Sequence, residues 1–277
     1  MRIDAHQHFW EYDPVRDSWI DDTMAVLKRD FLPADLEPVL KANRMDGSIA
    51  VQAGQSENET SFLLDLAEKN TFIKGVVGWV DLKDHGVDER LAFYSRNPLF
   101  RGVRHIVQAE PDEFMLNPDF QRGINYLCSF GLTYDILVYA RQLLAAIQLV
   151  DRFPDQPFVV DHIAKPEIRN KKMEPWSEHI HEIAGAKNVY CKLSGMVTEA
   201  DWNNWKEQDI IPYMDVVFNA FGPDRIMFGS DWPVCNPAGT FKEVIGIVEK
   251  YCTQYDDSIR AGIFAGNAIK FYKLDIG

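Results

Sequence analysis

Cysteine is scarce in this sequence of 277 residues, and long apolar runs are missing. The four cysteines, Cys128, Cys191, Cys235 and Cys252, form no CxxC pair and no dense framework, so we expect reduced thiols in a cytoplasmic protein. No apolar stretch approaches the roughly 18 residues of a membrane helix, so we expect no membrane span. Because a strand pattern starts at the first residues, we also expect no signal peptide.

Basic residues are also in short supply. Lys and Arg number 29 against 42 Asp and Glu, which gives a net charge of -13. No basic stripe is present, and this argues against nucleic acid as a partner. The acidic residues are spread along the chain and predict an ordinary solvated surface. A hydrophobic fraction of 46% allows a large core, and neither a linker nor an internal repeat divides the chain.

Short apolar runs alternate with amphipathic stretches throughout the sequence. Many of these runs are continuously apolar, as at 158–160, which is typical of parallel strands buried on both faces. We predict eight strands, at Arg2–His8, Gly47–Ala53, Ile73–Val80, Phe100–Val107, Leu132–Val138, Phe158–Ile163, Val189–Leu193 and Arg225–Gly229.

Helical patterns lie between these strands. Ser56 and Glu59 predict a capping box that opens one helix, and the 140–153 stretch carries its apolar residues on one face. Further helices are predicted at Phe120–Phe130, Glu174–Ala186, Gln208–Phe221 and Phe241–Tyr255. Eight alternating units predict an α/β fold, a single (β/α)8 TIM barrel spanning 1–277. A doubly wound sheet is less favoured because no Gly-rich fingerprint follows the first strand.

The segment Glu11–Phe31 has the pattern of a long loop that contains a helix. We expect it to cover one side of the barrel mouth, where Trp10, Tyr12 and Trp19 would form an apolar lining. Ordinary packing of these aromatic side chains against the rim of the barrel is an equal alternative.

Three histidines and one aspartate end apolar runs that lie far apart in the chain. His6 and His8 close the first strand two residues apart, so their side chains project the same way. His162 and Asp231 follow the apolar runs of the sixth and eighth strands. Because barrel strands meet at one mouth, we predict one catalytic site from these four residues. Asp231 is a candidate general base, and all four are candidate ligands of one divalent ion.

Other polar residues at the strand ends are candidate substrate ligands. Arg104 and His105 are neighbours, so only one faces the interior unless the strand ends between them, and an interior arginine needs a partner. Lys165 can reach back toward a carboxylate or hydroxyl group. Tyr139 supplies a further hydrogen-bonding group, and Trp232 is either a wall of the pocket or a packed rim aromatic.

The neighbour of His162 in the sequence, Asp161, is expected to point away from it and to orient another residue.

Eight short motifs carry a resemblance that covers nearly the whole chain. They are found at 4–10, 51–53, 75–82, 102–105, 131–135, 161–166, 192–195 and 229–233. Together they resemble the amidohydrolase-related (amidohydrolase 2) superfamily, and within it the sugar lactonase group that includes fucono- and rhamnono-lactonases.

The resemblance implies a lactonase of sugar acid catabolism, whose partner is a small-molecule sugar lactone. Asp231 would activate water, and His6, His8 and His162 would stabilise the oxyanion. Superfamily members with two metals use a histidine after the fifth strand, which this sequence lacks at 134–139. Two alternatives stay open, one divalent metal such as Zn²⁺ or metal-independent catalysis.

The runner-up activity on the same fold is metal-dependent decarboxylation of an aromatic or muconate-type acid. A homodimer is one option for the assembly.

Overall fold

The computed structural model describes residues 1–276, in which eight parallel strands form one sheet in sequence order. The sheet closes where Gln7 pairs with Trp232, and the Asp231 amide donates to the His6 carbonyl over 2.9 Å. The predicted barrel is therefore confirmed. The strands are β1 (Ile3–Gln7), β2 (Gly47–Val51), β3 (Ile73–Gly78), β4 (Phe100–Ile106), β5 (Thr133–Leu137), β6 (Phe158–Val160), β7 (Val189–Leu193) and β8 (Ile226–Phe228).

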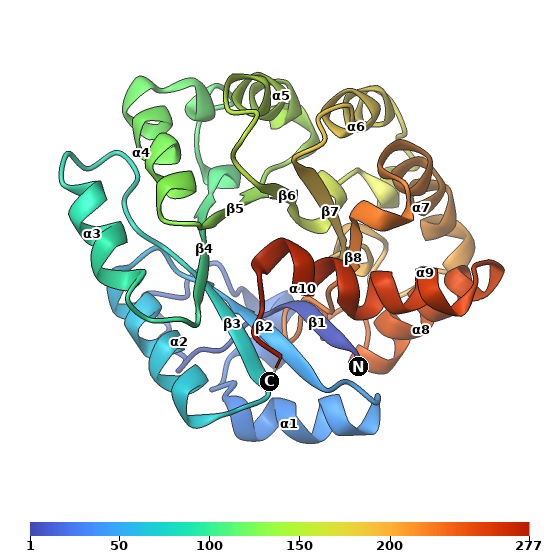
Figure 1. Cartoon of the computed structure of the whole chain (residues 1–277). Coiled ribbons are helices and arrows are strands. Elements are labelled where there is room, and N and C mark those ends of the chain that lie inside the picture. The colour runs from blue at the N-terminus through green and yellow to red at the C-terminus, as the bar shows by residue number, and fades with distance from the viewer. Residues whose placement is uncertain (277) are drawn as a thin grey trace.

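Helices form a ring outside the strands (Figure 1). They are α1 (Pro33–Ala42), α2 (Glu57–Lys69), α3 (Val87–Tyr94), α4 (Pro118–Ser129), α5 (Leu143–Arg152), α6 (Trp176–Ala184), α7 (Glu207–Phe221), α8 (Phe241–Tyr251), α9 (Asp257–Ala261) and α10 (Asn267–Tyr272). Within residues 1–276, no helix is both long enough and apolar enough to cross a membrane.

The helix ends follow local sequence signals, with some departures from prediction. Ser56 accepts a hydrogen bond from the Glu59 amide and caps α2 as predicted, but the other half of the capping box is missing, because the Glu59 carboxylate accepts from the Ala53 and Gly54 amides instead. The sequence patterns predicted none of α1, α3, α9 and α10. In α1 the proline at 38 weakens the helical pattern, and Asp35 caps the helix by accepting from the Leu32 amide. The predicted last helix was too long, because 252–254 form a 3-10 turn after α8.

A second apolar core fills the lower part of the barrel. Ile3, Ile49 and Met227 belong to a buried cluster that also contains Phe271 and Leu274 from the C-terminal segment. Figure 1 shows α10 lying across this end of the barrel. We call α10 and the residues beside it, 262–274, the C-terminal plug. The plug covers the end of the barrel opposite to the predicted site.

Close packing of α4 against the loop after β3 depends on a glycine, Gly123, which has no side chain. A Cβ atom at Gly123 would lie 2.1 Å from the Leu82 carbonyl oxygen, whereas a Cβ at Gly246 in α8 would meet no atom within 4 Å. We predict that Gly123→Ala lowers the free energy of unfolding by about 1–3 kcal/mol through overpacking. Gly246→Ala should raise it by about 0.5–1 kcal/mol, because alanine loses less backbone entropy in a helix.

Urea unfolding of the two variants beside the parent protein measures both effects. Equal stabilisation by the two alanines would show that α4 does not depend on this close approach.

Candidate active site

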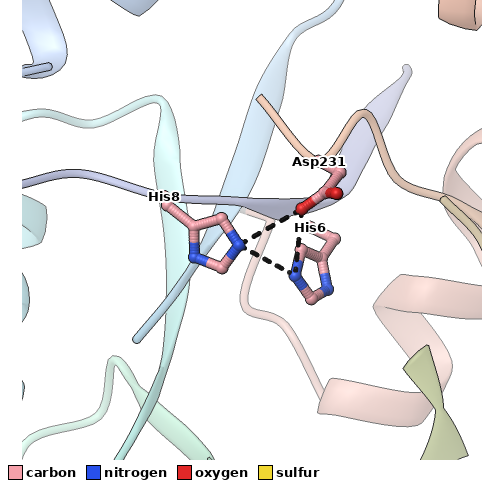
Figure 2. A group of neighbouring side chains, drawn as sticks. All are labelled: His6, His8 and Asp231. Carbon is pink, nitrogen blue, oxygen red and sulfur yellow. Dashed lines mark hydrogen bonds and ion pairs between the residues drawn. The ribbon is translucent and has the colours of Figure 1, made fainter. Parts of the chain in front are cut away.

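The four residues predicted to form one site do meet at the open mouth of the barrel. His6 Nε2 lies 3.2 Å from His8 Nε2, and His8 Nε2 lies 3.3 Å from Asp231 Oδ1 (Figure 2). The Nε2 atoms of His6 and His162 lie 3.9 Å and 3.8 Å from the same carboxylate oxygen. All four side chains are buried. One carboxylate oxygen and three imidazole nitrogens therefore converge on a common point.

Barrel closure positions Asp231 and His6 together. The Asp4 carboxylate accepts hydrogen bonds from the His6 amide at 3.1 Å, the Ser230 amide at 2.8 Å and the Ser230 hydroxyl at 2.6 Å. Asp4 therefore joins β1 to the turn after β8. The register of β1 against β2 shifts between Asp4 and Gln7, the stretch that contains His6.

A left-handed turn brings His162 into the site and corrects one expectation. Strand β6 ends at Val160, not at Ile163, and φ is +52° at His162. The turn breaks the alternation of a strand, so Asp161 and His162 both reach the interior, contrary to the prediction that they point apart. Gly195, with φ of +60°, leaves room for this turn, because a Cβ there would lie 2.6 Å from His162 Nδ1.

Two of the imidazoles are oriented through Nδ1. His8 Nδ1 lies 2.7 Å from the Val51 carbonyl, which can only accept, so this nitrogen carries the proton and Nε2 presents a lone pair. His162 Nδ1 lies 2.8 Å from the Ser194 hydroxyl. Burial lowers the pKa of His8, and lowers the pKa of His6 and of His162 well below the ordinary value. All three are therefore neutral at neutral pH.

In the Asp231 carboxyl group, unlike in the three histidines, the neighbouring groups outweigh the effect of burial on the pKa. Burial raises its pKa, but the neighbouring His162, His8 and Lys165 outweigh burial and hold the pKa below its usual value. Its Oδ2 atom is buried and has no hydrogen-bond partner among residues 1–276. An ionised oxygen without a partner is available to accept a proton or to bind a ligand.

Beneath His6 lies a layer of four buried charges, which we call the charge layer: Arg104, Lys192, Asp135 and Asp161. Lys192 Nζ lies 2.6 Å from Asp135 Oδ2 and 2.9 Å from Asp161 Oδ1, and Arg104 Nη1 lies 3.1 Å from Asp161 Oδ2. Tyr272 of the C-terminal plug donates to Asp135 over 2.8 Å.

The charge layer touches the site through His6. Lys192 Nζ lies 3.1 Å from His6 Nδ1, and Arg104 Nη1 lies 3.2 Å from His6 Nε2. The sequence analysis missed the inward roles of Asp135, Asp161 and Lys192, although each lies in one of the eight motifs. Alternation along β7 was the available signal for the inward position of Lys192. It puts the Lys192 side chain on the same face of the strand as Tyr190 and on the opposite face from Cys191.

A cavity of about 540 Å³ opens above the imidazoles. This volume is in the usual range for small-molecule sites. Its apolar walls include Trp19 and Met24 from the long segment after β1, and Trp202 after β7. Trp19 thus meets the expectation of a lining residue, whereas Trp10 is buried and packs against Phe31.

The cavity also contains most of the predicted substrate ligands. Arg104, Lys165 and Tyr139 line it, together with His8, His162 and Asp231, whereas His6 lies below the surface. Lys165 Nζ lies 2.8 Å from Glu199 Oε1, a lining residue that the sequence analysis missed. Burial lowers the pKa of Lys165, but Glu199 and Asp231 outweigh burial and raise it, so the amine is charged.

Two predicted substrate ligands lie outside the cavity lining. His105 faces away from the barrel interior, where it stacks on Phe114 at 4.7 Å and contacts Glu110 over 3.0 Å. Alternation places it opposite Arg104, so the geometry does not support a role in binding. Trp232 packs edge-on against Phe31 at 5.2 Å and is the rim aromatic of the alternative interpretation.

The set of ligand atoms fits one divalent cation. A hydrogen-bond donor competes with such a cation at His6. A tetrahedral ion with bonds of about 2.0–2.1 Å holds its ligand atoms about 3.3 Å apart. His6, His8 and Asp231 offer atoms separated by 3.2, 3.3 and 3.9 Å. The Nδ1 contacts of His8 and His162 are the supporting bonds that metal-ligating imidazoles make. The Arg104 guanidinium is directed at the same His6 nitrogen that such an ion would use.

Comparison with known proteins places this geometry in context. A family model described as Amidohydrolase matches residues 3–274. The chain is 39% identical to an L-fucono-1,5-lactonase of Burkholderia multivorans, over 99% of this chain and 96% of that protein. It is 26% identical to an L-rhamnono-gamma-lactonase of Scheffersomyces stipitis, over 74% of this chain and 70% of that protein.

A crystal structure of a Burkholderia multivorans amidohydrolase with bound Zn has a TM-score of 0.96 and 39% identity. The match covers 99% of this chain and 100% of that one. These likenesses confirm the predicted family and fold.

Removal of the cation at the centre of the charge layer should be costly. We predict that Lys192→Met lowers the free energy of unfolding by about 3–5 kcal/mol, because Asp135 and Asp161 lose a buried partner. Tyr272→Phe removes one hydrogen bond and should cost about 1 kcal/mol. Lys242→Met, at an exposed position of α8, is the matched control and should stay within about 0.5 kcal/mol.

Denaturant unfolding of the three variants makes the comparison. If Lys192→Met were as mild as Lys242→Met, the two carboxyl groups would have to be uncharged in the folded protein.

Proposed function

This chain belongs to the amidohydrolase family, and on that premise we propose that it is a lactonase that opens a sugar lactone to the sugar acid. The observation that carries the proposal is the charge balance of the cavity. Among residues 1–276, the cations that line it are Arg104 and Lys165, and each is already paired with a carboxylate. A neutral polyol lactone fits such a site better than a carboxylate substrate, which would need an unpaired cation.

Asp231 is the proposed general base. As a water oxygen bonds to the lactone carbonyl carbon, Asp231 takes a proton from that water, and the carbonyl oxygen becomes an oxyanion. When the bond between this carbon and the ring oxygen breaks, Asp231 returns the proton to the ring oxygen. The product is the open hydroxy acid. The lowered pKa and the unpartnered Oδ2 of Asp231 support this role.

The sequence assigned stabilisation of the oxyanion to all three imidazoles, and the geometry favours a different division of roles. A neutral His8 donates to Val51, so it turns a lone pair to the cavity and cannot donate to an oxyanion. Arg104 lines the cavity, and its guanidinium carries only hydrogen-bond donors, so it can face an oxyanion. We assign oxyanion stabilisation to Arg104, and sugar hydroxyl binding to Lys165, Glu199 and Tyr139.

His6, His8, His162 and Asp231 would hold a divalent cation where one binds. Such an ion polarises the lactone carbonyl and lowers the pKa of bound water. Relatives named as lactonases support the reaction class, and the relative solved with bound Zn supports a divalent cation as a ligand of this fold.

Loss of the base should abolish turnover. We predict that Asp231→Asn lowers kcat for lactone hydrolysis by roughly 10²- to 10⁴-fold, because the amide cannot accept the proton of water. Asp81→Asn is the matched control, since Asp81 follows β3 as Asp231 follows β8 but does not line the cavity. Initial rates and circular dichroism of both variants test this assignment, and near-normal turnover by Asp231→Asn would exclude it.

Acid release from a panel of aldonolactones tests the function itself. We expect rapid hydrolysis of one stereochemical set, followed with a pH indicator before and after treatment with a chelator. A chelator-resistant rate would assign carbonyl polarisation to the protein side chains, and a loss restored by Zn²⁺ would assign it to the ion. Release of carbon dioxide from aromatic acids with no lactone hydrolysis would overturn the proposal in favour of a decarboxylase.

A further inference from the structure

His6 lies between two cationic hydrogen-bond donors. Arg104 Nη1 is 3.2 Å from its Nε2, and Lys192 Nζ is 3.1 Å from its Nδ1. A neutral imidazole has one lone pair, so it can accept from only one of these donors. Neither donor has a lone pair of its own to offer in return. The nearest acceptor for a proton on Nδ1 of His6 is Asp161 Oδ1 at 3.4 Å, whereas Nδ1 of His8 lies 2.7 Å from the Val51 carbonyl.

Arg104 is fixed in this position from two sides. Its Nη2 donates to the Gln52 carbonyl, and its Nη1 donates to Asp161 Oδ2 over 3.1 Å. Gln52 completes the arrangement, because its side-chain amide donates to the Arg104 carbonyl over 3.2 Å. The guanidinium side chain is only 3% exposed, so solvent does little to screen its charge. Withdrawal of Arg104 from His6 would disturb several buried contacts.

A metal ion at His6 Nε2 needs a lone pair on that nitrogen, and the Arg104 guanidinium faces the same nitrogen from 3.2 Å. We propose that Arg104 is a built-in competitor for the divalent cation at His6 Nε2. A cation binds there only as the guanidinium contact is given up, and the proton of His6 must then lie on Nδ1, beside Lys192. Metal affinity is therefore lower than the donor set of His6, His8 and Asp231 would give by itself. The same contact keeps His6 in place when no cation is bound.

This inference concerns the site of the proposed function, but its readout is metal binding and not turnover. It can therefore fail while the lactonase proposal stands, and the reverse is also true.

The test compares metal affinity of variants that start from metal-stripped protein. Competition with a chromophoric chelator measures the Kd for Zn²⁺, and Co²⁺ absorption reports the coordination number. Arg104→Gln should bind Zn²⁺ about 10- to 100-fold more tightly than the parent protein, the range of one charge-assisted hydrogen bond. Arg104→Met should show the same gain, which excludes the new carboxamide as a ligand.

Arg101→Gln is the matched control, because Arg101 lies on the same strand but does not line the cavity. It removes the same charge and should leave the Kd unchanged. Unchanged or weaker Zn²⁺ binding by both folded Arg104 variants would overturn the proposal. So would an equal gain in Arg101→Gln, because net charge alone would then explain it.

A measurement on the parent protein covers the case in which the variants do not fold. A crystal structure at saturating Zn²⁺ should show the ion at His6 Nε2 and the Arg104 guanidinium beyond hydrogen-bond distance from it. Zn²⁺ bound at His6 with the Arg104 contact still in place would overturn the proposal.

Discussion

Closure of the sheet is the constraint on which the site depends. His6 and Asp231 are 225 positions apart in sequence, and they meet because β1 pairs with the turn after β8. The Asp4 carboxylate joins the two segments through both Ser230 donors and the His6 amide. The proposed general base and the first imidazole are therefore positioned by the same contacts that close the barrel.

The second constraint is the neutrality of the charge layer. Two cations and two carboxylates are buried together, and each has a partner of opposite sign within about 3 Å. An isolated charge at such depth would be very costly, so the layer is stable only as a set. Tyr272 extends the set to the C-terminal plug. The lower end of the barrel thus supports His6 through polar contacts as well as through apolar packing.

Much of this arrangement could be predicted from sequence, for reasons that also explain the failures. Apolar runs identified all eight strands, and polar residues at their ends identified His6, His8, His162 and Asp231. The inward position of Asp161 could not be predicted, because a left-handed turn of non-glycine residues breaks the alternation rule. Buried partners such as Lys192 and Asp135 lie 57 positions apart, and in sequence a buried charge looks like a surface one.

The charge balance of the mouth also bears on product release in the proposed reaction. A lactone substrate would enter without charge, whereas the sugar acid would leave as an anion. The cavity keeps Arg104 and Lys165 paired and holds the ionised Asp231 at its base, so it has no unpaired cation among its described lining residues for the product. Repulsion between Asp231 and the new carboxylate then favours release of the product. A site arranged to bind a carboxylate substrate would need the opposite balance, so one set of ion pairs is consistent with both the proposed substrate class and release of its product.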